Sequence, residues 1–335
     1  MLTVPPSNRF IRFLAKILPG LCLGGTVHAA SLPGPLVNVA WLHDHSSEVQ
    51  IVDIRDDVNS LTSDPQFETR DGHKILIKVG GYIPGALSVN FWSLRDKREI
   101  DGQAINFLPP SPKNFQEVMQ ASLLEPDRPI VLVPTGDDSG SLQEAAYLAW
   151  ELQLMGVKDD QLAILNGGTH AWIAAGYSVD TDAIAPMSTG HWLAKPVNSA
   201  FLATTPQVLQ AARTPGQPLL IDARPIAQYV GVEKSIVATR PGRIPSAHPL
   251  PPSALYRVAD DGSARFLTMA QYRALIPLFS LPSKGAMIVY CNTGQYAASV
   301  WFIMNRLLGN DQVRVYPGSI NEWTHLNEPL SELPG

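Results

Sequence analysis

The chain has 335 residues, with 25 lysines and arginines against 30 aspartates and glutamates, so its formal net charge is −5. This length predicts about two domains. The acidic balance and the lack of basic runs argue against a nucleic-acid partner. Apolar residues make up 45% of the chain, which is enough to build sizeable cores.

The first 30 residues are predicted to form a signal peptide. A positively charged region precedes a short apolar stretch at 17–25, and Val27 and Ala29 are small residues at the positions that a signal peptidase needs. The apolar stretch is too short to cross a bilayer. We therefore expect export, to the periplasm or another site outside the cytoplasm, and no membrane span in the mature chain. Cleavage would remove Cys22.

Four landmarks occur twice along the chain, in the same order. The first series is Asp53-Ile54-Arg55, Ile83-Pro84, the apolar run 130–133 and Gly167 to Trp172. The second series is Asp222-Ala223-Arg224, Ile244-Pro245, the apolar run 287–290 and Gly318 to Trp323. A duplicated domain explains this order. We expect domains at 31–182 and 200–335, joined by a linker at 183–199 that contains prolines and a glycine.

Each copy alternates short apolar runs with helical patterns. Strands are predicted at 51–54, 130–133, 163–165, 219–222, 287–290 and 313–316, and amphipathic helices at 144–156 and 297–309. Continuous apolar strands between helices indicate an α/β fold, with a mostly parallel sheet flanked by helices in each domain. Functional groups in such sheets lie beyond the carboxyl ends of the strands. Asp222, Arg224 and Cys291 occupy such ends.

Cys291 is the single cysteine expected in the mature chain. It follows a predicted strand, and the next helix is predicted to begin at Ala297. A short loop between strand and helix turns backbone N–H groups inward, and this anion-binding cradle favours the thiolate form of a cysteine. Gly294 permits the tight curve. Such a thiolate can attack an electrophilic sulfur and hold it as a persulfide, without a cofactor or a second cysteine.

Several of these segments resemble tandem rhodanese-domain sulfurtransferases, most of all exported bacterial thiosulfate sulfurtransferases. They are the two Asp-x-Arg strand ends, the Gly-x-Ile-Pro-x-Ala segments, Tyr-Cys-Asn-Thr-Gly at 290–294, and the closing Pro-Gly-Ser…Glu-Trp. The resemblance covers nearly the whole mature chain. It implies that only the C-terminal domain is catalytic, and the run 130–133 indeed leads into Pro134 and offers no thiol.

The resemblance also implies roles for individual residues. Cys291 would carry the persulfide, and Asp222 and Arg224 would brace its loop. The partners would be a small sulfur donor such as thiosulfate and a small acceptor, cyanide or a thiol, with a protein acceptor as a further option. The backbone of five residues would form the cradle, namely Asn292, Thr293, Gly294, Gln295 and Tyr296.

Two departures from the family bear on the donor. Thiosulfate-specific members carry basic residues in the cysteine loop, whereas this loop is neutral. They also carry an arginine a few residues after the Asp-x-Arg, where this chain has Gln228 beside Tyr229. Arg240 and Arg243 are candidates to bind an anionic donor instead, because the segment TRPGRIP is expected near the site.

Two other functions could use a cysteine at the end of a strand. A cysteine phosphatase needs a longer loop and an arginine six positions after its cysteine, where this chain has Ala297. A non-catalytic sulfur-carrier or thiol-binding module of the cell envelope is the alternative, and repeated turnover would distinguish an enzyme from it. No metal is expected, because no third ligand cluster accompanies His43-Asp44-His45. Trp172 and Trp323 are interpreted as core residues.

Overall fold

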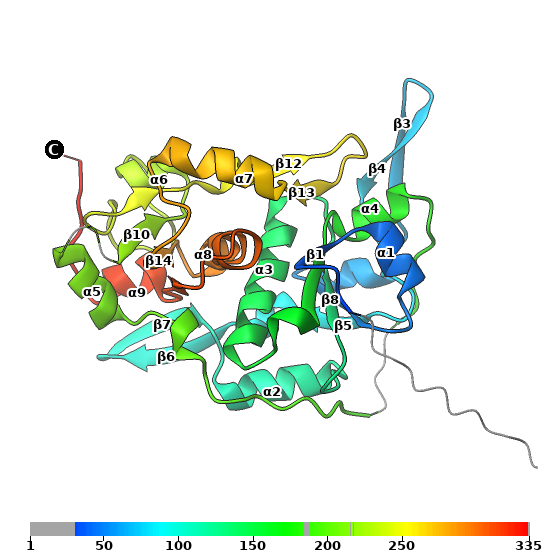
Figure 1. Cartoon of the computed structure of the whole chain (residues 1–335), viewed down its shortest axis with the longest axis horizontal. Helices are drawn as coiled ribbons and strands as arrows, with labels where there is room; N and C mark the ends of the chain where they lie inside the picture. Colours follow the sequence, from blue (N-terminus) through cyan, green and yellow to red (C-terminus); the bar gives the residue numbers. More distant parts are fainter. Residues whose placement is uncertain (1–30, 184–187, 215, 217, 334–335) are drawn as a thin grey trace, which may run out of the picture.

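The computed structural model describes residues 31–183, 188–214, 216 and 218–333. The predicted signal peptide and part of the predicted linker lie outside these ranges. Figure 1 shows two α/β units side by side, with the first copy at the right and the second at the left. Among the residues described, no helix combines the length and the apolar character that crossing a membrane requires.

Each unit is built on a parallel sheet, as expected from the apolar runs. In the first copy the strand order is β1-β9-β8-β2-β5, with β1 Leu36–Val37, β2 Gln50–Arg55, β5 Leu87–Asn90, β8 Ile130–Val133 and β9 Leu162–Leu165. In the second copy the order is β11-β10-β14-β15, with β10 Leu219–Asp222, β11 His248–Pro249, β14 Met287–Tyr290 and β15 Val313–Val315. All pairs within these two sheets are parallel.

The two sheets repeat the same register at their centres. Asp222 lies opposite Tyr290, the residue before Cys291. Asp53 lies opposite Val133 at the equivalent place in the first copy. Every residue of the central strands β8 and β14 is buried, because helices cover both faces of each sheet. The duplication read from the sequence is therefore confirmed in three dimensions.

The helices follow the strands in the order that a doubly covered sheet requires. They are α1 Val39–Asp44, α2 Pro112–Ala121, α3 Ser139–Leu154, α4 Gly168–Ala174, α5 Thr205–Arg213, α6 Ile226–Val230, α7 Met269–Leu275, α8 Gln295–Trp301 and α9 Ser319–His325. A π-helical segment, Phe302–Leu307, continues α8. Short 3₁₀ turns lie at Val58–Thr62, Phe91–Leu94, Asp159–Gln161, Ser199–Phe201, Pro252–Ala254 and Ile276–Phe279.

The prediction of amphipathic helices was wrong for α3. This helix begins five residues earlier than predicted, where the side chain of Asp138 accepts a hydrogen bond from the Ser141 N–H. It is buried on every face from Ser141 to Leu154. Figure 1 shows the reason: α3 lies between its own sheet and α8 of the second unit, so no face is left for solvent. One hydrophobic core runs through both helices and both units.

Two hairpins tie the units together from opposite sides. Hairpin β6–β7 (Asp96–Ile100 and Gln103–Leu108) extends from the first unit to the second, where the carbonyl of Asn106 accepts from Asn321 Nδ2 at 2.8 Å. Hairpin β12–β13 (Tyr256–Val258 and Ala264–Phe266) extends the other way, and the Ala264 N–H donates to the Gly136 carbonyl at 2.8 Å. A third hairpin, β3–β4 (Gln66–Arg70 and His73–Lys78), projects from the first unit.

The described part of the predicted linker packs against the first unit. Gly190 donates its N–H to the Gln120 carbonyl at 2.8 Å. Trp192 is buried and meets Phe115 of α2 edge to face, with ring centroids 5.5 Å apart. This segment therefore forms a strap along α2 rather than a free connection.

Candidate active site

The cysteine loop is shorter than the sequence suggested. Cys291 is the first residue after β14, and α8 begins at Gln295, two residues before the predicted start. Gly294 caps this helix with φ of 93°, a backbone conformation that favours glycine. A Cβ atom at Gly294 would also come within 3.1 Å of the Pro317 carbonyl oxygen. Glycine is therefore required at the turn that closes the loop.

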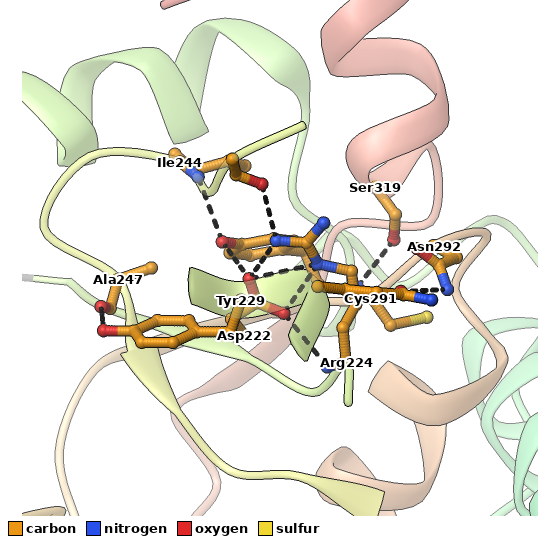
Figure 2. Close-up of polar contacts among 11 residues, drawn as sticks. Asp222, Arg224, Tyr229, Ile244, Ala247, Cys291, Asn292 and Ser319 are labelled. Carbon is orange, nitrogen blue, oxygen red and sulfur yellow. Dashed lines mark hydrogen bonds and ion pairs between the residues drawn. The ribbon is translucent and has the colours of Figure 1, made fainter. Parts of the chain in front are cut away.

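The backbone around Cys291 is held from several sides. Its Sγ accepts a hydrogen bond from the Gly294 N–H at 3.1 Å. Its own N–H donates to Ser319 Oγ at 3.0 Å, as Figure 2 shows. The first turn of α9 binds the loop in turn, because the N–H groups of Ile320 and Asn321 donate to the carbonyls of Cys291 and Asn292 at 3.0 and 3.2 Å.

The predicted braces, Asp222 and Arg224, form a buried ion pair beside the loop (Figure 2). Arg224 Nε and Nη2 donate to the carboxylate of Asp222 at 2.9 and 2.6 Å, and Nη2 also donates to the Gly242 carbonyl at 2.9 Å. Tyr290 donates its hydroxyl to the same carboxylate at 2.7 Å. Burial alone would lower the pKa of Arg224, but the hydrogen bonds and the charge of Asp222 raise it. The pair fixes the strand end from which Cys291 extends.

The first copy keeps this framework without the thiol. Asp53 and Arg55 form the same buried ion pair, and Arg55 Nη2 donates to the Gly81 carbonyl at 3.0 Å. Pro134 stands where the second copy has its cysteine, and its carbonyl accepts from the Thr169 N–H at 2.9 Å. The first copy therefore has the same loop architecture with a proline in place of the cysteine.

The side chain of Cys291 borders a cavity of about 220 Å³, although the residue is only 1% exposed. We call it the cysteine cavity. Both units contribute to its lining, with Phe91, Trp92, Arg95 and Phe107 from the first and Ser235, Val237, Asn292, Thr293, Gln295 and Tyr296 from the second. Tyr296, whose backbone was expected to form the cradle, also lines this cavity.

Arg95 supplies a positive charge at the cysteine cavity. Its Nη1 donates to the Thr293 carbonyl at 2.9 Å and to the Phe107 carbonyl at 3.2 Å. Its guanidinium also lies over the ring of Tyr147, 3.9 Å from the centroid. Sequence reasoning missed this residue because 198 positions separate it from Thr293. One signal could have found it: Arg95 lies shortly beyond the carboxyl end of β5, and functional sites in parallel sheets form at that edge of the sheet.

The two arginines expected to bind an anionic donor lie elsewhere. Arg240 donates to the Glu328 carbonyl at 2.9 Å and pairs with Glu332 at 3.4 Å. The guanidinium of Arg243 lies over the ring of Tyr229, 4.9 Å from its centroid. Neither lines the cysteine cavity.

Gln228, which stands where the resemblance implies an arginine, contacts the cysteine loop. Its Oε1 accepts from Asn292 Nδ2 at 2.9 Å. The neighbouring Tyr229 points the other way and donates its hydroxyl to the Ala247 carbonyl at 2.9 Å (Figure 2). Gln228 therefore orients the loop without adding charge to it.

A second cavity, of about 370 Å³, adjoins the first. We call it the acidic chamber. Four residues line both cavities: Phe91, Trp92, Gln295 and Tyr296. The chamber is otherwise formed by the thiol-free loop and neighbouring segments of the first copy, including Asp56, Asp57, Lys78, Asp137, Asp138, Ser141, Gln143 and Glu144. Burial raises the pKa of Glu144 to about 8, with a further contribution from the charges of Asp56 and Asp138.

A duplicated parallel α/β unit, with one cysteine at the carboxyl end of a central strand in the second copy, defines a tandem rhodanese fold. The chain belongs to the rhodanese-like domain family, whose model matches residues 38–175 and 205–326. It is 30% identical to a thiosulfate sulfurtransferase of Corynebacterium glutamicum, over 73% of this chain and 78% of that protein.

Other relatives extend the comparison. The chain is 26% identical to the sulfur carrier protein TtuD of Thermus thermophilus, over 88% of this chain and 95% of the relative. Among solved structures, SseA from Escherichia coli, a 3-mercaptopyruvate sulfotransferase, superposes with a TM-score of 0.66 at 22% identity, covering 85% of this chain and 98% of that one. This last likeness confirms the fold.

We predict that Asp222→Asn destabilises the protein and loosens the cysteine loop. The substitution leaves the buried Arg224 charge uncompensated, which should lower the free energy of unfolding by about 3–5 kcal/mol. Alkylation of Cys291 by iodoacetamide, followed by mass spectrometry of its peptide, should become faster because a loosened loop exposes the sulfur.

The matched control is Asp53→Asn, which breaks the same ion pair in the first copy. Asp53→Asn should lower the free energy of unfolding by a similar amount, as measured by urea unfolding. It should not speed the alkylation of Cys291 in the folded protein. Equal alkylation rates in the two variants would show that the Asp222 pair acts only through global stability.

We predict a pH-dependent stability difference between the wild type and Glu144→Gln. Because the folded pKa of Glu144, about 8, exceeds its unfolded value, the stability it contributes is fully present below pH ~4.3 and is lost as the pH rises through 8. Glutamine does not ionise, so the variant should gain stability relative to the wild type between about pH 5 and 8, on the order of a few kcal/mol. Urea unfolding across this range measures it. A parallel Glu99→Gln substitution, at an exposed position, should give a flat difference.

Proposed function

We propose that the protein is a sulfurtransferase that moves a sulfane sulfur from a small donor, such as thiosulfate, to cyanide or a thiol through a persulfide on Cys291. The observation that carries this proposal is the sulfur of Cys291, hydrogen-bonded to the Gly294 N–H and bordering a cavity at the end of β14. The name of the Corynebacterium relative supports the same chemistry. The sequence of residues 1–30 supports export, so we propose that this chemistry takes place outside the cytoplasm.

In the loading step, the Cys291 thiolate attacks the outer sulfur of thiosulfate. A new S–S bond forms while the bond to the sulfonate group breaks, and sulfite leaves with that bonding pair. The Gly294 N–H and the start of α8 stabilise negative charge on the attacking sulfur. The outer sulfur of the persulfide then occupies the cysteine cavity, where an acceptor can reach it.

In the transfer step, the acceptor attacks the outer sulfur of the persulfide and Cys291 departs as a thiolate. Cyanide yields thiocyanate, and a thiolate yields a new persulfide. Neither step has a net requirement for protons or electrons, so the cycle needs no redox cofactor. We therefore propose that the covalent persulfide is the only carrier that the reaction requires.

Arg95 is the residue that we propose to attract an anionic donor. The cysteine loop itself carries no charged side chain, and Arg240 and Arg243 do not line the cavity. A guanidinium at a cavity wall attracts a dianion more strongly than it would in water, because the surrounding protein is less polarisable. Arg95 also donates to the Thr293 carbonyl, so its charge is fixed beside the reacting sulfur.

A non-catalytic sulfur carrier is the second candidate, and the likeness to TtuD, named a sulfur carrier protein, favours it. Both functions require the same persulfide. They differ in whether the protein completes repeated cycles with a small acceptor or delivers its sulfur to a protein partner.

We predict that Cys291→Ser abolishes sulfur loading. Wild-type protein incubated with thiosulfate should gain the mass of one sulfur atom on the peptide that contains Cys291, and addition of cyanide should release thiocyanate over many cycles. The serine variant should do neither. Thiocyanate formation by the variant would contradict the enzyme proposal, and a single loading without turnover in the wild type would favour the carrier.

We predict that Arg95→Gln lowers kcat/KM for thiosulfate by roughly 10- to 100-fold, because a charge-assisted contact is lost. The control is Arg98→Gln, which removes a charge three residues further along the chain, at an exposed position in β6 away from the cysteine cavity. Steady-state thiocyanate formation measures both variants. Equal activity of the two would show that Arg95 does not bind the donor.

A further inference from the structure

Two of the carboxylates that line the acidic chamber, Asp57 and Asp137, have partners within the protein. Asp57 pairs with Lys78 at 3.6 Å. Asp137 accepts from the Val79 N–H at 3.0 Å and lies 2.9 Å from Nδ1 of His170. These contacts account for the positions of two of the acidic groups. They do not involve Asp56, which is exposed, or Glu144, which is buried, although both line the chamber.

The floor of the chamber is polar and buried. Gln143 is 3% exposed and Glu144 is 6% exposed, yet both line the cavity. Within the described residues, the side chain of Gln143 has no hydrogen-bond partner in the protein. Burial raises the pKa of Glu144, and the charges of Asp56 and Asp138 add to the rise. A buried amide facing a cavity, beside carboxylates that repel one another, indicates a site for a ligand with a donor and a positive charge.

The shared wall between the two cavities is aromatic. Trp92 is half exposed, and Phe91 meets it edge on, with ring centroids 5.6 Å apart. Tyr296 lines both cavities. Burial raises its pKa, and the charges of Cys291 and Asp138 add to the rise. Aromatic faces beside carboxylates suit an organic ammonium group. A bound metal ion is a poorer fit, because no group of three metal-ligating side chains occurs in the part of the chain that the structure describes.

We propose that the acidic chamber binds the ammonium group of an aminothiol that accepts sulfur from Cys291. This inference rests on the proposed sulfurtransferase function and names the acceptor class. The thiolate of the acceptor attacks the outer sulfur of the persulfide, Cys291 leaves as a thiolate, and the product is the persulfide of the aminothiol. The ammonium group keeps its proton throughout.

The charges of the two cavities separate donor from acceptor. Arg95 lines the cysteine cavity and favours an anionic donor, whereas the acidic chamber repels one. The four shared lining residues make the cavities neighbours, so a short aminothiol can place its ammonium group in one and its sulfur in the other. The first copy would thereby select the acceptor, although it carries no thiol.

The test compares three acceptors that differ in charge: cysteamine, 2-mercaptoethanol and 3-mercaptopropionate, each with thiosulfate as donor. The readout is the ratio of kcat/KM for cysteamine to that for 2-mercaptoethanol, because intrinsic thiol reactivity cancels when the ratio is compared between variants. The double variant Asp56→Asn/Glu144→Gln should lower this ratio by about tenfold or more, mainly through the KM for cysteamine. Glu99→Gln, which removes one exposed carboxylate outside the chamber, is the matched control.

A second measurement uses 2-aminoethanol, which carries the ammonium group without a thiol. It should inhibit transfer to cysteamine competitively in the wild type and lose this effect in the double variant. An unchanged ratio in the double variant, or no inhibition of the wild type, would overturn the inference. Cyanide, as a third kind of acceptor, shows which proposal fails. If the protein forms thiocyanate but shows no charge preference among thiols, only the acceptor site is overturned. If it transfers sulfur to no acceptor, the proposed function is overturned as well.

Discussion

The packing of α3 against α8 is the contact on which the rest of the molecule depends. Each helix follows the central strand of its own sheet, so their contact brings the carboxyl ends of the two sheets to one boundary. Neither helix retains a solvent face, and a single apolar core extends through both units. Arg95 and Phe107 reach the cysteine loop only because this contact fixes the two units against each other. Residues of both domains are therefore needed to form the site.

Local sequence patterns predicted the framework of each unit well. The buried strands are short uninterrupted apolar runs, and such runs are recognisable without knowledge of their partners. The cysteine, its glycine-containing loop and the Asp222–Arg224 pair lie within a few residues of strand ends, which parallel sheets place at a common edge. The identical order of the repeated landmarks predicted the domain duplication. These features were predictable because each is determined by neighbouring residues in the sequence or by the pairing of adjacent strands.

Features that depend on contacts between the copies were not predictable in the same way. The polar residues of α3 suggested a solvent-facing side, but Gln143 and Glu144 line a cavity, and Glu151 is fully buried at the boundary. Burial raises the pKa of Glu151 well above its usual range, because an apolar surrounding solvates the charged form poorly. The exchanged hairpins and Arg95 depend on pairings across long stretches of chain. The hydrophobic periodicity of one segment does not indicate which distant surface that segment will contact.

The reciprocal hairpins have a consequence for truncation of the chain. Because β6–β7 lies on the second unit and β12–β13 lies on the first, each copy completes the fold of the other. A truncation that removed the first copy would also take Phe91, Trp92, Arg95 and Phe107 away from the cysteine cavity. The two copies therefore cannot be separated without changing the surroundings of Cys291.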